Sequence, residues 1–222
     1  GKIGEITMIE VEVKLALTDS KRVEQKLRKD GFVLQKIVRE TDTYFNGVDR
    51  DFRKTDEALR VRKTEVLKNV TDLSETDILS EHSTEQSVTE NDSQIQSFVT
   101  YKGPKLEETS MTRKELEIPI EDDAAMSGLL VALGYHPVPS VIKCRKYYVL
   151  DHMTACLDSV EGLGEYLELE ILVEQEEDRQ QALQQIEERL LSLGYSMQDT
   201  TRISYLSMLE KIWEKNGVTY HE

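Results

Sequence analysis

Charged residues alternate with aliphatic residues along several short stretches of the chain, and these charged residues are the candidates for chemistry. Within residues 9–15, Glu10, Glu12 and Lys14 separate four aliphatic side chains. The same alternation recurs at residues 59–62, 101–102, 113–118, 142–145, 157–158 and 167–171. Successive side chains of a β-strand point to opposite faces, so each stretch predicts a strand with one apolar and one charged face.

The charged faces hold acids and bases in equal number. The basic positions are Lys14, Arg60, Arg62, Lys102, Arg113, Lys143 and Arg145. The acidic positions are Glu10, Glu12, Glu115, Glu117, Asp158, Glu168 and Glu170. Clustered Lys and Arg suit a polyanion, and clustered carboxylates suit hard cations such as Mg²⁺ or Mn²⁺. Any single strand of this kind is more typical of a sheet with one solvated face. Gathered in one cavity, however, the two sets predict a metal–polyphosphate ligand.

Three helical patterns end in Gly followed by an aromatic residue, at Gly31, Gly134 and Gly194. Such a Gly enters the left-handed conformation cheaply and ends a helix in the Schellman arrangement. With acids and cap residues before each pattern, helices are expected at 19–30, 122–133 and 178–193. A fourth helix is expected at 202–215, with one apolar stripe formed by Ile203, Leu206, Leu209 and Ile212.

Four helices with apolar stripes need an apolar surface to cover. If they cover the apolar face of the sheet, the charged face lies on the other side, and a long sheet closes on that side to remove its free edges. The fold class expected is therefore α+β, with a closed barrel that has a charged interior and helices outside. We expect one domain over residues 8–215, preceded by an extension at 1–7 and interrupted by an acidic, Ser- and Thr-rich insertion at 66–97.

The composition excludes several classes of protein. The 222 residues carry a formal net charge of −15, which argues against a general nucleic-acid binder and against docking on an anionic membrane. No apolar run approaches the length of a membrane-spanning helix, and the first residues lack an apolar signal core. Two cysteines do not form a disulfide scaffold, so a reducing, cytoplasmic location is expected.

Several segments resemble, in order, the motifs of the CYTH family, the triphosphate tunnel metalloenzymes. Residues 8–14 resemble the opening ExExK motif, and residues 59–62 resemble the LRxR motif. The remaining matches are residues 42–45, 100–105, 143–147, 156–164 and 168–170. Of these, 100–105, 143–147 and 156–164 resemble the class IV adenylyl cyclase branch most closely. The resemblance implies an eight-stranded antiparallel barrel, a tunnel that binds a triphosphate, and Mg²⁺ or Mn²⁺ as cofactor.

The resemblance also implies roles for individual residues. The metal ligands would be Glu10, Glu12, Glu168 and Glu170. The triphosphate would be bound by Arg60, Arg62, Lys102, Arg113, Lys143 and Arg145. Lys14 and Asp158 would be catalytic, and Glu115 and Glu117 would be tunnel acids without an assigned role. The insertion after Arg62 departs from the family pattern and leaves the loops at the tunnel mouth undefined.

The resemblance favours a class IV adenylyl cyclase, which converts ATP to cyclic AMP and pyrophosphate. The same residues would serve a triphosphatase that removes the terminal phosphate of inorganic, nucleoside or thiamine triphosphate. A third alternative is a module that binds polyphosphate or nucleotide without turnover. The expected partner is thus ATP or another triphosphate, and the sequence leaves a homodimer open.

Overall fold

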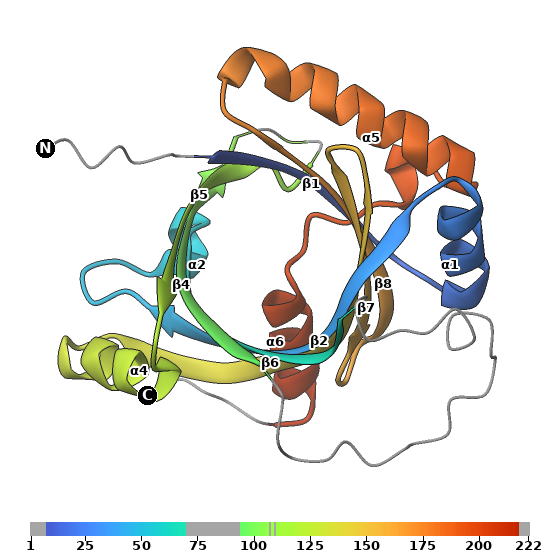
Figure 1. The fold of residues 1–222 in the computed structure, drawn as a ribbon. Coiled ribbons are helices and arrows are strands. Elements are labelled where there is room, and N and C mark those ends of the chain that lie inside the picture. The colour runs from blue at the N-terminus through green and yellow to red at the C-terminus, as the bar shows by residue number, and fades with distance from the viewer. Residues whose placement is uncertain (1–7, 70–93, 107, 109, 218–222) are drawn as a thin grey trace, which may run out of the picture.

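Eight antiparallel strands close into a barrel in the computed structural model, which describes residues 8–69, 94–106, 108 and 110–217 (Figure 1). The strands are β1 (Met8–Ala16), β2 (Val33–Asn46), β3 (Ala58–Asn69), β4 (Ile95–Lys105), β5 (Arg113–Ile120), β6 (His136–Leu150), β7 (Met153–Val160) and β8 (Gly164–Val173). Their order around the barrel is β1-β5-β4-β3-β2-β6-β7-β8. The predicted closed, eight-stranded antiparallel barrel is confirmed.

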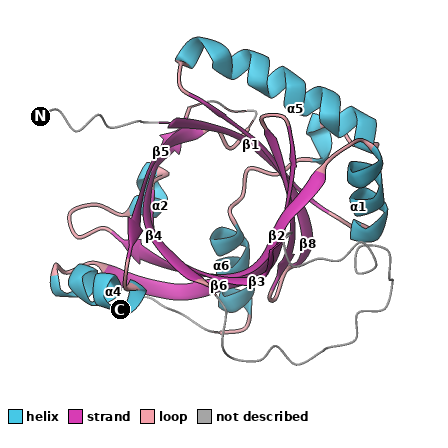
Figure 2. Cartoon of the chain, viewed as in Figure 1, coloured by secondary structure: helices cyan, strands magenta, loops and turns pink. Residues whose placement is uncertain are grey.

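Five helices accompany this barrel in the described part of the chain (Figure 2). The helices are α1 (Ser20–Lys29), α2 (Phe52–Thr55), α4 (Asp123–Ala132), α5 (Arg179–Leu193) and α6 (Tyr205–Lys215), with short 3-10 turns η2 (Glu176–Asp178) and η3 (Met197–Asp199). Three of them, α1, α4 and α5, pack on the outside of the barrel. Helices α1 and α5 bury Leu27 and Ile186 against the aliphatic side chains of β1 and β8, such as Val13 and Leu169. Helix α4 buries Leu130 against the outer face of β2 and β3. The apolar faces of the strands are therefore the outer faces of the barrel.

The three predicted Gly-aromatic helix ends are confirmed. At the end of α1, the amide of Phe32 donates to the carbonyl of Leu27 at 3.0 Å, and the amide of Gly31 donates to Arg28 at 3.1 Å. Gly31 has a φ of 97°, the left-handed conformation that the motif requires. The same pair of hydrogen bonds ends α4 at Gly134 and α5 at Gly194.

Helix α6 departs from the expectation that every helix covers the outer face. Its Tyr205 and Leu209 are buried with Val141, Val160 and Tyr166. These strand residues share the parity of the interior residues of their strands, so α6 packs on the inner face, at one end of the barrel.

The predicted apolar stripe of this last helix was also wrong in part. Ile203 precedes the helix, and both Ile203 and Ile212 are exposed. Because the helix begins at Tyr205, its buried residues are Tyr205 and Leu209, four positions apart, and the three-residue spacing assumed from the sequence does not define its buried face.

The first and last residues of the insertion predicted at 66–97 belong to strands, since β3 extends to Asn69 and β4 begins at Ile95. The amide of Val66 donates to the carbonyl of Gln94 at 3.1 Å, so both flanks pair as strands. The remainder, 70–93, lies outside the described residues, as does the extension at 1–7. Within the described ranges, no helix is both long and apolar enough to cross a membrane.

Candidate functional site

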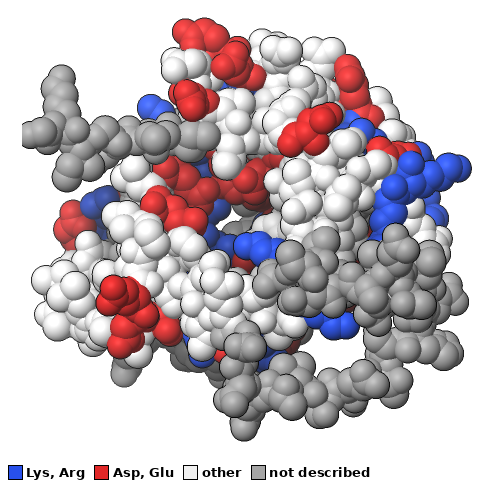
Figure 3. Space-filling model, in the orientation of Figure 1, with Lys and Arg blue, Asp and Glu red and all other residues white. Residues whose placement is uncertain are grey.

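A cavity of about 940 Å³ occupies the inside of the barrel. Its lining comes from the inner faces of the strands other than β7 and from α2 and α6, with as many Lys and Arg residues as Asp and Glu residues. Figure 3 looks into the opening, where acidic side chains crowd one side and basic side chains show on the other. The predicted site residues all line this cavity except Asp158.

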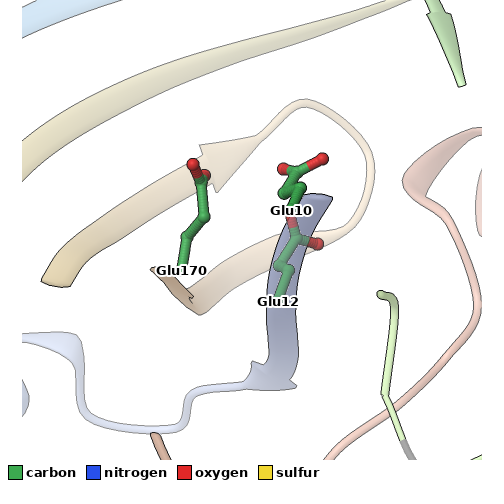
Figure 4. Close-up of side chains that lie close together, drawn as sticks. All are labelled: Glu10, Glu12 and Glu170. Atoms are coloured by element: carbon green, nitrogen blue, oxygen red, sulfur yellow. The ribbon is translucent and has the colours of Figure 1, made fainter. Parts of the chain in front are cut away.

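One side of the cavity is formed by β8, β1 and β5 and carries the acid wall. We define this wall as Glu10, Glu12, Glu115, Glu117, Glu168 and Glu170. The carboxylates of Glu10, Glu12 and Glu170 lie within 4.8 Å of one another (Figure 4). Glu12 and Glu170 face each other across the β1–β8 ladder, so the register brings them together. Three convergent carboxylates are a donor set that suits a hard divalent cation.

Glu168 was predicted to join these ligands, but its neighbours are cations. The ammonium of Lys14 lies 3.2 Å from one Glu168 oxygen, and the guanidinium of Arg145 contacts the other. Burial opposes the charge of Glu168, but these cations hold its pKa down at about 2. Glu168 thus links the acid wall to the basic residues, while the other three predicted ligands, Glu10, Glu12 and Glu170, form the three-carboxylate cluster.

Burial and mutual repulsion raise the pKa of part of the acid wall. Burial, together with the charges of Glu168 and Glu10, raises the pKa of Glu12 well above its usual value. Burial and the nearby Glu10 raise the pKa of Glu170 to about 8. Burial also raises the pKa of Glu115 to about 7. Glu10 differs, because the ammonium of Lys102, 2.8 Å away, overcomes the effect of burial and lowers its pKa.

The opposite side of the cavity, formed by β3 and β6, carries the cation wall. We define this wall as Arg60, Arg62, Lys143 and Arg145. The guanidinium of Arg62 donates to both oxygens of Asp42, at 2.6 and 2.7 Å. The ammonium of Lys143 lies 2.9 Å from Glu40 and 3.2 Å from Asp42.

Both of these acids are 1% exposed, and neither lines the cavity. Burial disfavours their charge, but Arg62 and Lys143 lower the pKa of both Glu40 and Asp42. The buried carboxylates therefore lie behind the cations and hold them toward the cavity.

Arg145 is held in the same way by Asp158. Its guanidinium donates to both Asp158 oxygens, at 2.6 and 2.5 Å, and Asp158 also accepts a hydrogen bond from the hydroxyl of Tyr205 at 2.8 Å. Asp158 is fully buried. Asp158 was predicted to be catalytic, but it lies behind Arg145 and acts on the cavity through that guanidinium.

Arg60 is the cation with the weakest partners on this wall. It lies 3.7 Å from Asp42 and 3.8 Å from Glu117, and its Nη2 donates to Thr100 at 3.3 Å. Its buried Nε has no hydrogen-bond acceptor among the described residues. A buried donor without an acceptor costs free energy, and an anion in the cavity would satisfy it.

Lys102 on β4 and Arg113 on β5 line the cavity beside the acid wall. Lys102 bridges Glu10 and Glu115, at 2.8 and 2.7 Å. Arg113 lies 3.7 Å from Asp56, whose αL conformation ends α2 at the cavity. The predicted phosphate-binding residues therefore share one cavity, although their partners differ.

The sequence did not single out Glu40 and Asp42 as site residues. They alternate with Arg39, Thr41 and Thr43, which are not aliphatic, so this part of β2 lacks the apolar face that identified the other strands. Asp42 fell within a family motif without an assigned role. The polar side chains at alternate positions 40, 42 and 44 were the sequence signal that could have placed Glu40 and Asp42 on the inner face.

Comparisons with known proteins agree with this architecture. The CYTH domain matches residues 8–205. A protein of Methanocaldococcus jannaschii, provisionally named an adenylate cyclase, is 37% identical over 201 residues, which are 90% of this chain and 98% of that protein. A solved structure from Pyrococcus horikoshii has a TM-score of 0.74 and 33% identity, and the match covers 91% of this chain and 99% of the other.

A more distant solved structure shares the fold alone. It is a provisionally named adenylyl cyclase from Hippeastrum, whose structure is described as revealing a dominant triphosphatase activity. Its TM-score is 0.53 at 15% identity, and the match covers 97% of this chain and 100% of that chain. The match of the domain to residues 8–205 and the 37% identity to the archaeal relative are decisive. This chain belongs to the CYTH family.

Proposed function

We propose that this chain is a metal-dependent enzyme that acts on a nucleoside triphosphate, converting ATP to cyclic AMP and pyrophosphate. The observation that carries the proposal is the pair of facing walls. A cluster of three carboxylates lies across one cavity from a row of Arg and Lys side chains. The archaeal relative provisionally named an adenylate cyclase, matched over 98% of its length, supports this reaction over others.

The three carboxylates fit a divalent cation, because hard cations such as Mg²⁺ and Mn²⁺ prefer oxygen ligands that converge on one point. Glu10, Glu12 and Glu170 would hold Mg²⁺ or Mn²⁺. Such an ion supplies Lewis-acid stabilisation of charge on the phosphate oxygens. The raised pKa of Glu12 and Glu170 is consistent with this role, because their carboxylates are uncompensated without a cation.

The cation wall would bind the phosphate chain. Arg60 and Arg62 present guanidinium groups that match phosphate oxygens, and the unpaired Nε of Arg60 offers a donor. In the proposed reaction, the ribose 3′ hydroxyl loses its proton to water, and the bond between its oxygen and the α-phosphorus forms. The bond from the α-phosphorus to the bridging oxygen breaks, and pyrophosphate leaves. Lys143 and Arg145 would stabilise the charge that grows on the leaving pyrophosphate.

The same walls would also hold a triphosphate whose terminal phosphorus is attacked by water. The Hippeastrum protein, described with a dominant triphosphatase activity, is similar to this chain in fold. Hydrolysis is therefore the second candidate, and the products distinguish it from cyclisation.

The test is a product analysis. The protein is incubated with ATP or with inorganic triphosphate, each with Mg²⁺, Mn²⁺ or a chelator, and the products are separated by chromatography. Cyclic AMP and pyrophosphate, formed only with metal, are the expected products. ADP and phosphate, or cleavage of inorganic triphosphate, would replace the cyclase with a triphosphatase. Binding of triphosphate without any product would overturn the assignment as an enzyme.

A further inference from the structure

We propose that Tyr205, the first residue of α6, is a positioning residue that orders Lys14 and Arg145 for the triphosphate. This inference rests on the proposed function and adds a side chain from outside the eight strands to the site. Tyr205 lines the cavity and is 5% exposed. It contacts Lys14, which pairs with Glu168, and it also contacts Asp158, which pairs with Arg145.

The ring of Tyr205 lies against Lys14. The Lys14 ammonium is 4.0 Å from the ring centroid, a cation–π distance, and 3.2 Å from Glu168. Lys14 is 3% exposed, so these contacts replace most of its hydration. The lysine side chain is flexible, so its ammonium adopts a single position only when its neighbours restrict it. The ring of Tyr205 restricts the Lys14 ammonium to its place beside Glu168.

The backbone before Tyr205 holds Lys14 as well. The amide of Thr201 donates to the carbonyl of Lys14 at 2.7 Å and forms a bridge beside β1. The Nε of Arg202 donates to the carbonyl of Ser110 at 3.1 Å. The segment 201–205 thus contacts Lys14 at its main chain and at its ammonium.

The hydroxyl of Tyr205 reaches the other predicted catalytic residue. It donates to Asp158 at 2.8 Å, and the same carboxylate holds Arg145 through two hydrogen bonds. Burial and the nearby Glu168 and Asp158 raise the pKa of Tyr205, so the hydroxyl keeps the proton that it donates. Arg145 is therefore fixed by Asp158, and Asp158 is fixed in turn by Tyr205.

Tyr205 can act in this way because its own position is fixed. Its ring packs edge-on against Tyr166, with centroids 5.1 Å apart and planes at 70°. Leu209, one turn later, is buried in the same cluster. Ser204 caps the helix by accepting a hydrogen bond from the amide of Ser207 at 3.1 Å. The ring is held from the apolar end of the barrel and presents its face to Lys14.

The experiment compares four variants with the wild type. Tyr205→Leu and Tyr205→Met remove the ring, and either one suffices if the other does not fold. Tyr205→Phe keeps the ring. Leu209→Ala is the matched control, because it removes packing from α6 without touching a cation or lining the cavity. Melting temperatures confirm which variants are folded.

Two readouts are taken from each folded protein. The first is the affinity for inorganic triphosphate with Mg²⁺, measured by titration calorimetry. The second is the rate at which an amine-reactive ester labels Lys14 relative to Lys102, measured by mass spectrometry without ligand. Lys102 lies in the same cavity, so wider opening of the cavity would speed both reactions, whereas release of Lys14 alone raises the ratio.

Loss of the ring is expected to weaken triphosphate binding about tenfold and to raise the labelling ratio several-fold, consistent with the strength of buried cation–π contacts. Leu209→Ala should leave both readouts within about threefold of the wild type. Tyr205→Phe should leave the labelling ratio unchanged but weaken triphosphate binding by about threefold to tenfold, because it removes the hydrogen bond to Asp158 behind Arg145. Equal effects of Tyr205→Leu and Leu209→Ala would overturn the positioning role. If the wild type binds no triphosphate, the proposed function fails, and the labelling ratio still decides whether Tyr205 orders Lys14.

Discussion

The two walls of the cavity carry opposite charges and handle them in different ways. On the cation wall, Arg62, Lys143 and Arg145 each have a buried carboxylate behind them. On the acid wall, Glu12 and Glu170 face each other and Glu10, and burial raises the pKa of both residues. One wall is neutralised by the chain itself. On the other wall, burial raises the pKa of Glu12, Glu115 and Glu170, and a bound cation would offset the repulsion between their carboxylates.

This difference teaches which half of the site is preformed. Fixed ion pairs orient the guanidinium groups before any ligand arrives, and such preorganised charge needs no rearrangement during a reaction. Buried carboxylates without cations carry a desolvation and repulsion cost that protonation reduces. The cation wall should therefore depend on its own counter-charges for stability, and the acid wall should respond to metal and pH.

The largest expected effect comes from the acid cluster. Glu170→Gln keeps the shape of the side chain but removes one anionic ligand, so metal-dependent turnover of triphosphate should fall by about 100-fold or more, the scale of losing charge stabilisation at a reacting group. The melting temperature without metal should stay the same or rise, because one of the repelling groups is gone. Initial rates and thermal melts measure both quantities.

The matched control for that variant is Glu165→Gln. Glu165 lies on the same strand with the opposite parity and does not line the cavity. Its rate should equal that of the wild type. Unchanged turnover in Glu170→Gln would remove Glu170 from the site, and equal losses in both variants would point to damage of β8 as a whole.

The next largest effect separates two arginines of the cation wall. Arg62→Met leaves Asp42 and Glu40 with Lys143 as their main remaining cation, and removing one partner of a buried ion pair costs about 3–5 kcal/mol. The melting temperature should fall by about 10 °C or more in a chain of this length. Arg60→Met removes only weak ion pairs, so stability should change little while triphosphate affinity falls about tenfold.

Denaturation curves and titration calorimetry check this contrast between the arginines. The comparison between the walls fails if Arg60→Met destabilises the fold as much as Arg62→Met, because the buried carboxylates would then not distinguish the two positions. Lys63→Met, on the outer face of β3, provides the baseline for losing a half-buried cation outside the cavity.

The smallest effect is a dependence of stability on pH. Glu12, Glu115 and Glu170 have raised pKa values, of about 7 for Glu115 and about 8 for Glu170. Each binds a proton more tightly folded than unfolded, so its stabilising contribution is complete below the unfolded value of 4.5 and is lost as pH rises through the folded value. The metal-free melting temperature should therefore fall by a few degrees between about pH 5 and 8.5.

Saturating Mg²⁺ should reverse that slope, because metal binding requires the deprotonated carboxylates. Acids with lowered pKa values, such as Glu40 and Asp42, titrate below this window and do not mask the effect. Thermal melts at several pH values, with a chelator and with Mg²⁺, make the measurement. A flat or rising metal-free curve in the wild type would contradict the raised pKa values of Glu12, Glu115 and Glu170.

Much of this architecture could be predicted from the residues because the strands alternate strictly. Glu10, Glu12 and Lys14 are separated by aliphatic residues that pack under α1 and α5, and this alternation places the charges inside once the sheet closes. The helix ends were also predictable, because a Gly before an aromatic residue encodes a specific pair of hydrogen bonds.

The remainder depended on geometry that one sequence does not contain. Glu168 and Glu170 are equivalent in pattern, but the register with β1 places Glu168 opposite Lys14 and Glu170 opposite Glu12. The position of α6 could not be predicted either, because an apolar helix face does not indicate which surface of the barrel it covers. Whether a charged residue lines the cavity or is buried behind another side chain, as Asp158 is behind Arg145, follows only from packing.

The three carboxylates of the acid cluster come from the first and the last strand of the barrel in sequence order. Glu10 and Glu12 come from the first strand and Glu170 from the last, and β1 and β8 pair only when the barrel closes. Contacts so distant along the chain form late and slow folding. A divalent ion bound there would favour the closed form by mass action and act as a clasp on the finished barrel. Metal supply would then influence how much of the newly made protein completes its folding.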